Sequence, residues 1–235
     1  MSELVMEIRS ELIQNADEKT LKSSQRFFKE EVRCYGVKSA VVGRIAKKHH
    51  AEVKHKSKQE VFSLCEELLK SDYCEDAFIA FDWAYFLRKG YETGDLQVFE
   101  SWIEKYVNNW AKCDTFCNHT MGSFIEQFPQ HIEDLKRWTQ SSNRWLRRAS
   151  AVTLILPARK GEFLEDIFEI SDALLMDEDD LVQKGYGWML KEASKAHQKE
   201  VFEYVMRNKK DMPRTALRYA IEKLPKDLKS LAMEK

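Results

Sequence analysis

The sequence predicts an all-α protein, a solenoid of stacked helix pairs, from its composition, its apolar periodicity and a degenerate internal repeat. Charged residues make up 33% of the 235 residues and hydrophobic residues 43%, with only 8 glycines and 4 prolines. This composition favours helices over an architecture of strands and tight turns. A chain of this length can form one sizeable core or one continuous repeat array. We expect a single helical-repeat domain over residues 1–235.

Apolar residues spaced three and four apart mark the helices in the first half of the chain. Three such stripes predict helices with one buried face, over residues 61–69, 78–85 and 99–106. Polar connectors in which Asp, Ser or Asn can cap the next helix lie at residues 71–72, 92–95, 140–143 and 211–213. Helices therefore follow one another with short breaks.

The only stretch that resembles a strand, residues 152–156, fits a helix better. Trp145, Ala149, Val152 and Leu156 fit one helix, and we expect Pro157 to end it because proline breaks a helix interior. No sheet is predicted.

A degenerate repeat indicates helix pairs in the second half of the chain. Residues 146–149, 182–185 and 212–215 align at offsets of 36 and 30 residues, and in each an apolar residue precedes a cation by two positions. This pattern is typical of helix-pair solenoids, although chance similarity within a helical bundle is the alternative.

Targeting and redox signals point to a soluble protein. Residues 1–9 lack the apolar core of a signal peptide, and no apolar run approaches the length of a membrane span. The five cysteines are odd in number and mostly lie in apolar helical patterns, which favours reduced thiols. We expect a cytoplasmic monomer that needs no cofactor.

A net charge of −1 conceals two basic segments. Residues 22–58 carry eleven Lys or Arg against three Glu, and residues 136–160 carry seven cations and no acid. Basic patches on a helical array suit a polyanion such as DNA. The alternative is that such runs are solvated helix faces.

Two segments combine tryptophan with residue types that suit a binding site. Trp110 and Asp114 are four residues apart, which on a helix places indole and carboxylate on one face. Trp188 follows Gly185 and Gly187, and glycines in a helix cost about 1 kcal/mol each relative to alanine. These glycines indicate close approach by another backbone or a ligand.

Taken in order, residues 110–114, 144–149 and 183–188 resemble the bacterial DNA alkylation repair enzymes, the AlkD-like alkylpurine DNA glycosylases. Phe28-Lys29 and Tyr35-Gly36-Val37 match a further recurrent pattern, so the resemblance covers most of the chain. It implies a C-shaped stack of HEAT-like helix pairs with a basic concave face. It also implies base excision repair, by hydrolysis of the N-glycosidic bond of N3- or N7-alkylated purines in double-stranded DNA.

The same resemblance implies roles for individual residues. Asp114 would stabilise the positive charge that develops on deoxyribose and help to position water. Trp110 and Trp188 would pack against the sugar and backbone at the lesion. Arg148 would hold a nearby phosphate, and the further DNA-binding candidates are Arg147, Arg144, Lys29, Lys184 and Phe27. Some family members have Tyr where Phe27 stands, so a hydroxyl contact from that position is absent.

Structural alternatives exist for the three central residues. Trp110 and Trp188 could be core residues, and Asp114 could be a helix cap. Two other functions also stay open: a HEAT-repeat protein that binds DNA structures without catalysis, and a scaffold whose groove holds an acidic peptide.

Two clusters have simpler explanations than a metal site. Cys113, Cys117 and His119 lack a second pair of ligands, so they would not close a tetrahedral zinc shell. The acidic run at residues 177–180 fits a solvated helix start. We expect no bound metal.

Overall fold

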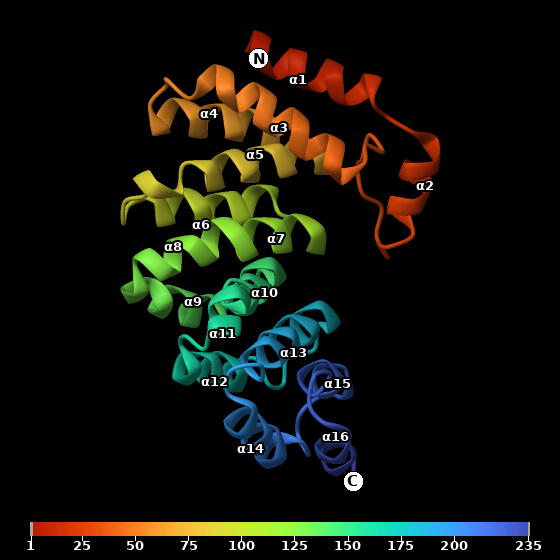
Figure 1. Ribbon diagram of the computed structural model, residues 1–235, viewed down its shortest axis with the longest axis vertical. Helices are drawn as coiled ribbons and strands as arrows, with labels where there is room; N and C mark the ends of the chain where they lie inside the picture. Colours follow the sequence, from red (N-terminus) through yellow and green to blue (C-terminus); the bar gives the residue numbers. More distant parts are fainter. Residues whose placement is uncertain (1, 235) are drawn as a thin grey trace. The chain divides into compact units, whose positions relative to one another are not determined.

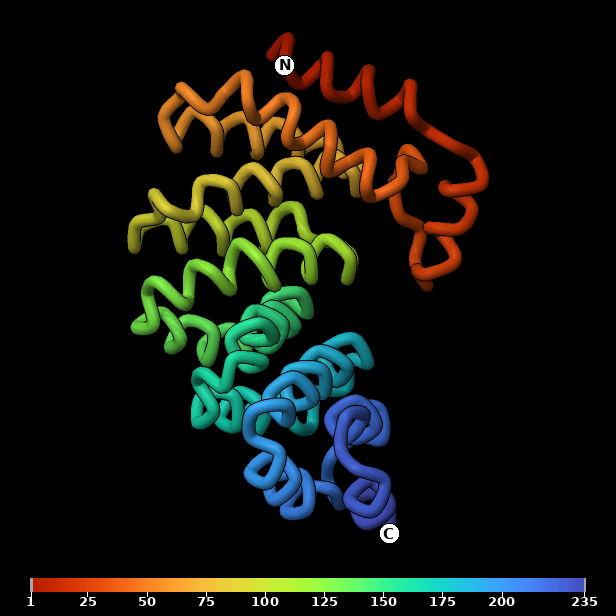
Figure 2. Tube along the Cα trace, in the orientation of Figure 1, coloured from red at the N-terminus to blue at the C-terminus, as the bar shows by residue number. Residues whose placement is uncertain are grey.

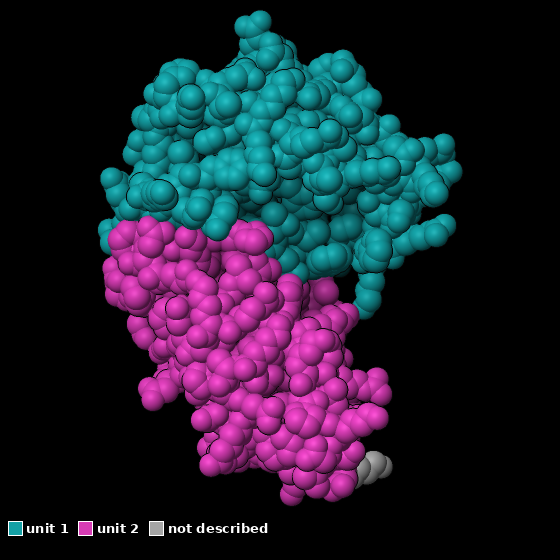
Figure 3. All heavy atoms as spheres, in the orientation of Figure 1, with its two compact units in different colours: residues 1–116 teal, residues 117–235 magenta. Residues whose placement is uncertain are grey.

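The computed structural model describes residues 2–234, and the secondary structure of this part is helical with no strand (Figure 1). The chain divides into two compact units, Met1–Phe116 and Cys117–Lys235 (Figure 3). The all-α prediction is confirmed, and the single domain over residues 1–235 stays a prediction.

The first unit is a stack of helices joined by short connectors. Its elements are α1 (Glu3–Gln14), α2 (Glu18–Gln25), α3 (Ser39–Val53), α4 (Lys58–Leu69), α5 (Cys74–Phe86), the 3-10 turn η1 (Arg88–Gly90), α6 (Asp95–Tyr106) and α7 (Trp110–Phe116). Helix α5 is the centre of the unit, because α3, α4 and α7 all pack against it. The three apolar stripes that predicted helices lie on α4, α5 and α6.

An aromatic cluster anchors the end of α7. The ring of Phe116 lies 4.6 Å from Phe81, 5.6 Å from Phe99 and 6.0 Å from Trp102, measured between centroids, and all four side chains are buried. Aromatic pairs at these separations add to the free energy gained from burial alone. The cluster fixes the helix on which Trp110 and Asp114 stand.

The α2–α3 loop (residues 26–38) is the long irregular segment of the first unit (Figure 2). Its second half is held by Glu75, near the start of α5, whose buried carboxylate accepts N–H bonds from Tyr35, Gly36 and Val37 at 2.9–3.0 Å. Gly36 has a φ of +89°, and a Cβ there would lie 2.7 Å from Leu21 Cβ, so glycine is required.

The second unit is also built of helix pairs. Its elements are the π-helical turn η2 (Cys117–Met121), α8 (Gly122–Gln127), the 3-10 turn η3 (Pro129–His131), α9 (Ile132–Trp138), α10 (Arg144–Val152), α11 (Ile155–Lys160), α12 (Leu164–Ala173), α13 (Asp180–Ala193), α14 (Gln198–Asn208), α15 (Arg214–Ala220) and α16 (Lys226–Met233). The predicted repeat copies fall at the starts of α10, α13 and α15, and α13 packs against both of the others. The chain is a helical-repeat solenoid.

The prediction that Pro157 ends a helix is wrong. Helix α10 already ends at Val152, and Pro157 is the third residue of α11. The first turn of a helix has no intrahelical partner for its N–H groups, so proline costs little there. The break comes instead at Leu154, whose φ of −87° and ψ of 2° are not helical.

Close packing against α15 explains why position 187 of α13 is a glycine. A Cβ on it would lie 2.7 Å from the carbonyl oxygen of Ala216 and 2.8 Å from Tyr219 Cβ. The predicted close approach is therefore made by the backbone of α15.

No described helix is long and apolar enough to cross a membrane, and all five cysteines are free thiols.

Candidate functional site

Trp110 and Asp114 lie one turn apart on α7, in the first unit, and both are half-buried. Asn109 precedes the helix and its Oδ1 accepts the backbone N–H of Lys112 over 3.0 Å, as an N-terminal cap does. Asp114 is the fifth residue of the helix, so the helix-cap interpretation of this carboxylate is wrong.

Exposure separates two tryptophans from the other four. Four tryptophan side chains are buried, namely Trp83, Trp102, Trp138 and Trp145. Trp110 and Trp188 are only half-buried. These are the two that the sequence motifs selected as functional. The alternative that they are core residues is not supported by their burial.

The tip of the α2–α3 loop lies on Trp110. The ring of Phe28 stacks on the indole with centroids 5.2 Å apart and planes 27° apart, and indole Nε1 donates to the carbonyl of Phe27 over 3.4 Å. The side chain of Phe27 itself is 71% exposed, and Lys29 beside it is also exposed. The loop thus brings two DNA-binding candidates, Phe27 and Lys29, to the helix that carries Asp114.

A buried lysine ties α7 to the connector between α4 and α5, and sequence reasoning missed it. Lys112 is 1% exposed, and its ammonium donates to Asp72 Oδ1 at 2.7 Å, to the Asp72 carbonyl at 3.0 Å and to Asn108 Oδ1 at 3.0 Å. Burial acts to raise the pKa of Asp72, but the hydrogen bond and charge of Lys112 outweigh it and the pKa lies below its usual value. The available signal was a lysine one turn before Phe116, on the apolar face of a short helix.

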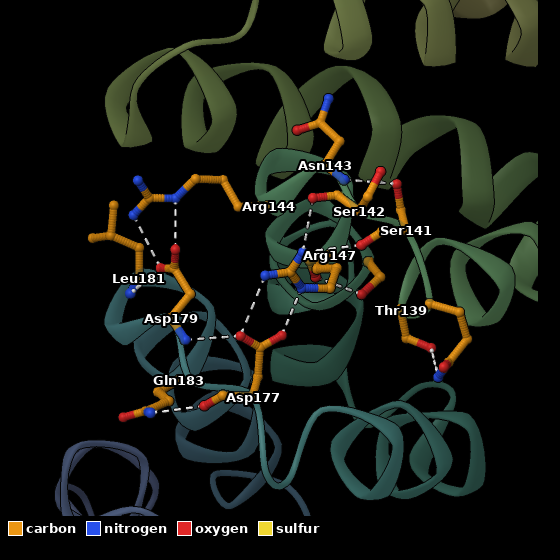
Figure 4. A network of polar contacts seen from close by, with 12 residues as sticks. Thr139, Ser141, Ser142, Asn143, Arg144, Arg147, Asp177, Asp179, Leu181 and Gln183 are labelled. Atoms are coloured by element: carbon orange, nitrogen blue, oxygen red, sulfur yellow. Dashed lines mark hydrogen bonds and ion pairs between the residues drawn. The ribbon is translucent and has the colours of Figure 1, made fainter.

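In the second unit the candidate arginines are paired with the acidic run before α13 (Figure 4). Arg144 Nε lies 2.7 Å from Asp179, and Arg147 Nε lies 2.6 Å from Asp177. Arg147 also donates to the carbonyls of Ser141 and Ser142. The prediction that residues 177–180 form a helix start is confirmed, but Asp177 and Asp179 are ion-paired rather than solvated. Asp179 does cap α13 by accepting the Leu181 N–H, but it also holds Arg144.

Arg148 is buried in the structure. Its guanidinium donates to the backbone carbonyl of Leu181, and a Cβ on Gly185 would lie 3.5 Å from its Cγ and Nη1. The second costly glycine of α13 thus lies directly against this arginine. Lys184 forms an ion pair of 3.0 Å with Asp180 in the same helix.

Acids from other segments also neutralise the rest of residues 136–160. Lys136 lies 2.8 Å from Asp166 and 2.6 Å from Glu169, and these hydrogen bonds raise its pKa above the usual range. The remaining pairs are Arg137 with Asp134, Arg159 with Glu192 and Lys160 with Glu126. Residues 136–160 contain no acid themselves, but acids from neighbouring segments lie beside their cations. The basic concave face stays a prediction.

Residues 22–58 differ because several of their cations point into solvent. Lys22, Lys48 and Lys58 form ion pairs, whereas Arg33, Lys38, Arg44 and Lys47 are exposed on the α2–α3 loop and α3. Residues 22–58 therefore offer exposed cations to a polyanion, whereas most cations of residues 136–160 are already paired.

Trp188 stands on α13 beside a cation. Lys191 Nζ lies 5.8 Å from the centre of the Trp188 ring and 5.7 Å from that of Tyr219, and it forms an ion pair of 3.1 Å with Glu222. The indole face therefore already has a positively charged neighbour, as a cation–π contact requires.

The residues considered for a metal site do not form one among the described residues. Cys113 and Cys117 are buried while His119 is exposed, and the group of ligand atoms within 4.8 Å of one another is instead Glu7, His49 and Glu52. His49 Nδ1 already contacts Glu52 over 3.0 Å.

Comparison with known proteins identifies relatives. Residues 8–224 match the family described as DNA alkylation repair enzyme. A solved structure described as a predicted DNA alkylation repair enzyme from Enterococcus faecalis is similar with a TM-score of 0.79 and 17% sequence identity, over 90% of this chain and 98% of that one. At this identity the second match shows the fold alone. No curated protein matches the chain.

Proposed function

This chain belongs to the DNA alkylation repair enzyme family, and from that premise we propose that it is an alkylpurine DNA glycosylase. It hydrolyses the N-glycosidic bond of N3- or N7-alkylated purines in duplex DNA. Asp114 stabilises the sugar cation and helps to position water, and Trp110 and Trp188 pack against the sugar and backbone at the lesion. The protein acts as a monomer without a metal or cofactor.

The observation that carries the proposal is the exposure of Trp110 and Trp188. An indole is among the most costly side chains to leave in water, so four of the six tryptophans are buried. The two that stay accessible are the two that the family motif would set against a sugar. Indole beside a sugar cation adds an attraction of about 0.5–2 kcal/mol.

One carboxylate is enough for the chemistry. A purine alkylated at N3 or N7 already carries positive charge and leaves without protonation, so the enzyme needs mainly to stabilise positive charge on the sugar. A carboxylate about 4 Å from that charge, at an effective dielectric constant of about 20, contributes about 4 kcal/mol, or about a thousandfold in rate. The half-buried position of Asp114 suits such an intermediate dielectric.

Contacts to DNA would divide between the two units. In the first unit, Phe27 presents an exposed ring and Lys29 an exposed ammonium beside Trp110. In the second unit, Arg144, Arg147, Arg148 and Lys184 can hold phosphates only by sharing or exchanging their present partners. Binding of this kind releases counterions and weakens as salt rises.

The test is base release from methylated duplex DNA. Wild type should release N7-methylguanine or N3-methyladenine, and Asp114→Asn should lower the single-turnover rate by about a hundredfold or more while leaving DNA affinity within a few-fold. Asp211→Asn, an exposed carboxylate before α15, is the matched control and should keep the wild-type rate.

Other results would assign a different function. Wild type that binds methylated DNA but releases no base is a DNA-structure-binding protein. Negligible DNA binding at low salt would support a scaffold that holds an acidic peptide.

A further inference from the structure

Two cysteines meet where the α2–α3 loop joins α5. Cys74 opens α5 and donates its backbone N–H over 2.9 Å to the carbonyl of Arg33, the residue before Cys34. Both cysteines are free thiols, and each acts on the pKa of the other. A disulfide requires Cα atoms no more than about 7 Å apart, and a backbone bond beside Cys34 brings the pair within that reach.

The surroundings make one member of the pair a nucleophile. The neighbouring Cys34 thiol lowers the pKa of Cys74 and outweighs burial, which raises it, while the nearby Lys112 charge acts in the same direction as Cys34. The Asn109 amide nitrogen lies 3.7 Å from Cys74 Sγ and donates to it. The neighbouring Cys74 thiol, together with burial, raises the pKa of Cys34. The thiolate is the reactive form of cysteine, so Cys74 should react first.

We propose that Cys34 and Cys74 are a redox pair that a hydroperoxide converts into a disulfide, which fastens the α2–α3 loop to α5. With hydrogen peroxide, the Cys74 thiol first loses its proton to solvent, the thiolate takes one oxygen from the peroxide, and the O–O bond breaks. The hydroxide that leaves takes up a proton from solvent and becomes the first water. The sulfur of Cys34 then displaces hydroxyl from the Cys74 sulfenic acid, and its thiol proton leaves with that hydroxyl as water. Two thiols are oxidised, and one peroxide is reduced to two waters.

Access to the pair runs through Cys34. Cys74 is 2% exposed and Cys34 is half-buried, so a small peroxide reaches Cys74 where Cys34 meets solvent. Cys65, Cys113 and Cys117 are fully buried, and burial raises the pKa of Cys65. These three thiols therefore serve as internal references for reactivity.

The disulfide would secure the loop that carries Phe27 and Phe28. At present the loop is held to α5 by the Glu75 hydrogen bonds and by Tyr35, whose ring stacks on Tyr73 with centroids 4.0 Å apart. A covalent link between residues 34 and 74 closes a loop of chain that includes α3 and α4, which removes conformations from the unfolded state. The oxidised protein should therefore melt at a higher temperature.

Peptide mapping of the wild-type protein tests the chemistry directly and does not depend on glycosylase activity. The full chain is treated with hydrogen peroxide, free thiols are blocked with N-ethylmaleimide, and the digest is analysed without reduction. We expect a peptide that links Cys34 to Cys74, and before blocking an intact mass about 2 Da below that of the reduced protein. Dithiothreitol should reverse the link, and the oxidised protein should melt about 5 °C or more above the reduced protein. Maleimide on both Cys34 and Cys74 after peroxide, or a link between other cysteines, would overturn the proposal.

Variants assign the order of the two steps. In Cys34→Ser, oxidation should stop at a sulfenic acid on Cys74 that dimedone traps. In Cys74→Ser, Cys34 should react with peroxide at least about tenfold more slowly than Cys74 does in Cys34→Ser. Cys65→Ser is the matched control and should form the disulfide as wild type does. Equal trapping of Cys34 in the Cys74→Ser variant would contradict the assignment of Cys74 as nucleophile. If a serine variant fails to fold, the wild-type map still decides whether the disulfide forms.

Discussion

Replacing Glu75 should release the α2–α3 loop from α5. Oε1 of this carboxylate accepts the N–H groups of Gly36 and Val37, and Oε2 accepts that of Tyr35. Hydrogen bonds to a charged group contribute about 1.5–3 kcal/mol each, and Glu75→Ala leaves three donors without this acceptor. Allowing for water that reaches half-buried Tyr35, we expect a loss of about 4–6 kcal/mol in the free energy of unfolding.

Urea denaturation followed by circular dichroism and tryptophan fluorescence measures this loss. Glu75→Gln keeps an acceptor for Gly36 and Val37 but turns an amide NH2 toward the Tyr35 N–H, so it should lose only about 1–3 kcal/mol. Glu104→Ala, an exposed acid on α6, is the control and should stay within about 0.5 kcal/mol of wild type. A Glu75→Ala protein that loses less than about 1 kcal/mol would refute the reasoning.

Three further predictions concern other parts of the fold. Gly187→Ala should destabilise the protein by about 2–4 kcal/mol because its Cβ meets α15, whereas Gly43→Ala, with open space around it in α3, should stabilise it by up to about 1 kcal/mol; equal effects in a melt would contradict the packing argument. Burial lowers the pKa of His50, so the unfolded state takes up its proton at higher pH and stability should fall as pH drops below about 6.5. His50→Phe should flatten that part of the pH profile, and an unchanged slope would count against it. Asp177→Asn frees Arg147 and should tighten DNA binding about 2–10-fold at low salt, whereas Arg147→Ala should weaken it; weaker binding by both variants in a titration would mean that the pair acts as one positioned unit.

Local spacing was enough to predict the helices and not enough to predict their ends. The stripes on α4, α5 and α6 could be read because a buried helix face repeats every three to four residues, whatever it packs against. Pro157 was misjudged because proline breaks a helix interior but suits a first turn, and a break at Leu154 leaves no such mark in the sequence. The boundary depends on the turn between two helices, which apolar spacing does not describe.

The sequence could predict the parts of the site that lie on a single helix. It could not predict the contacts between segments that are far apart along the chain. Trp110 and Asp114 share a face of α7 because they are four residues apart, and the sequence alone contains that fact. Lys112 and Glu75 act on residues 40 and 38–40 positions away, so their partners could not be inferred from neighbours along the chain. Lys112 holds the helix that carries Trp110 and Asp114, and Glu75 holds the loop that carries Phe27 and Phe28.

The charge pairs of the second unit show why a sequence window misjudges a repeat protein. Arg144 meets Asp179 at a separation of 35 residues, Arg147 meets Asp177 at 30, and Arg159 meets Glu192 at 33. These separations match the repeat offsets of 36 and 30 residues. In a solenoid each helix pair contacts its neighbours in the stack, so a residue lies beside residues about one repeat away. The basic character of a segment must therefore be judged together with the segment one repeat further on. By that measure residues 136–160 are largely neutralised. A DNA phosphate would have to compete there with carboxylates that are already in place.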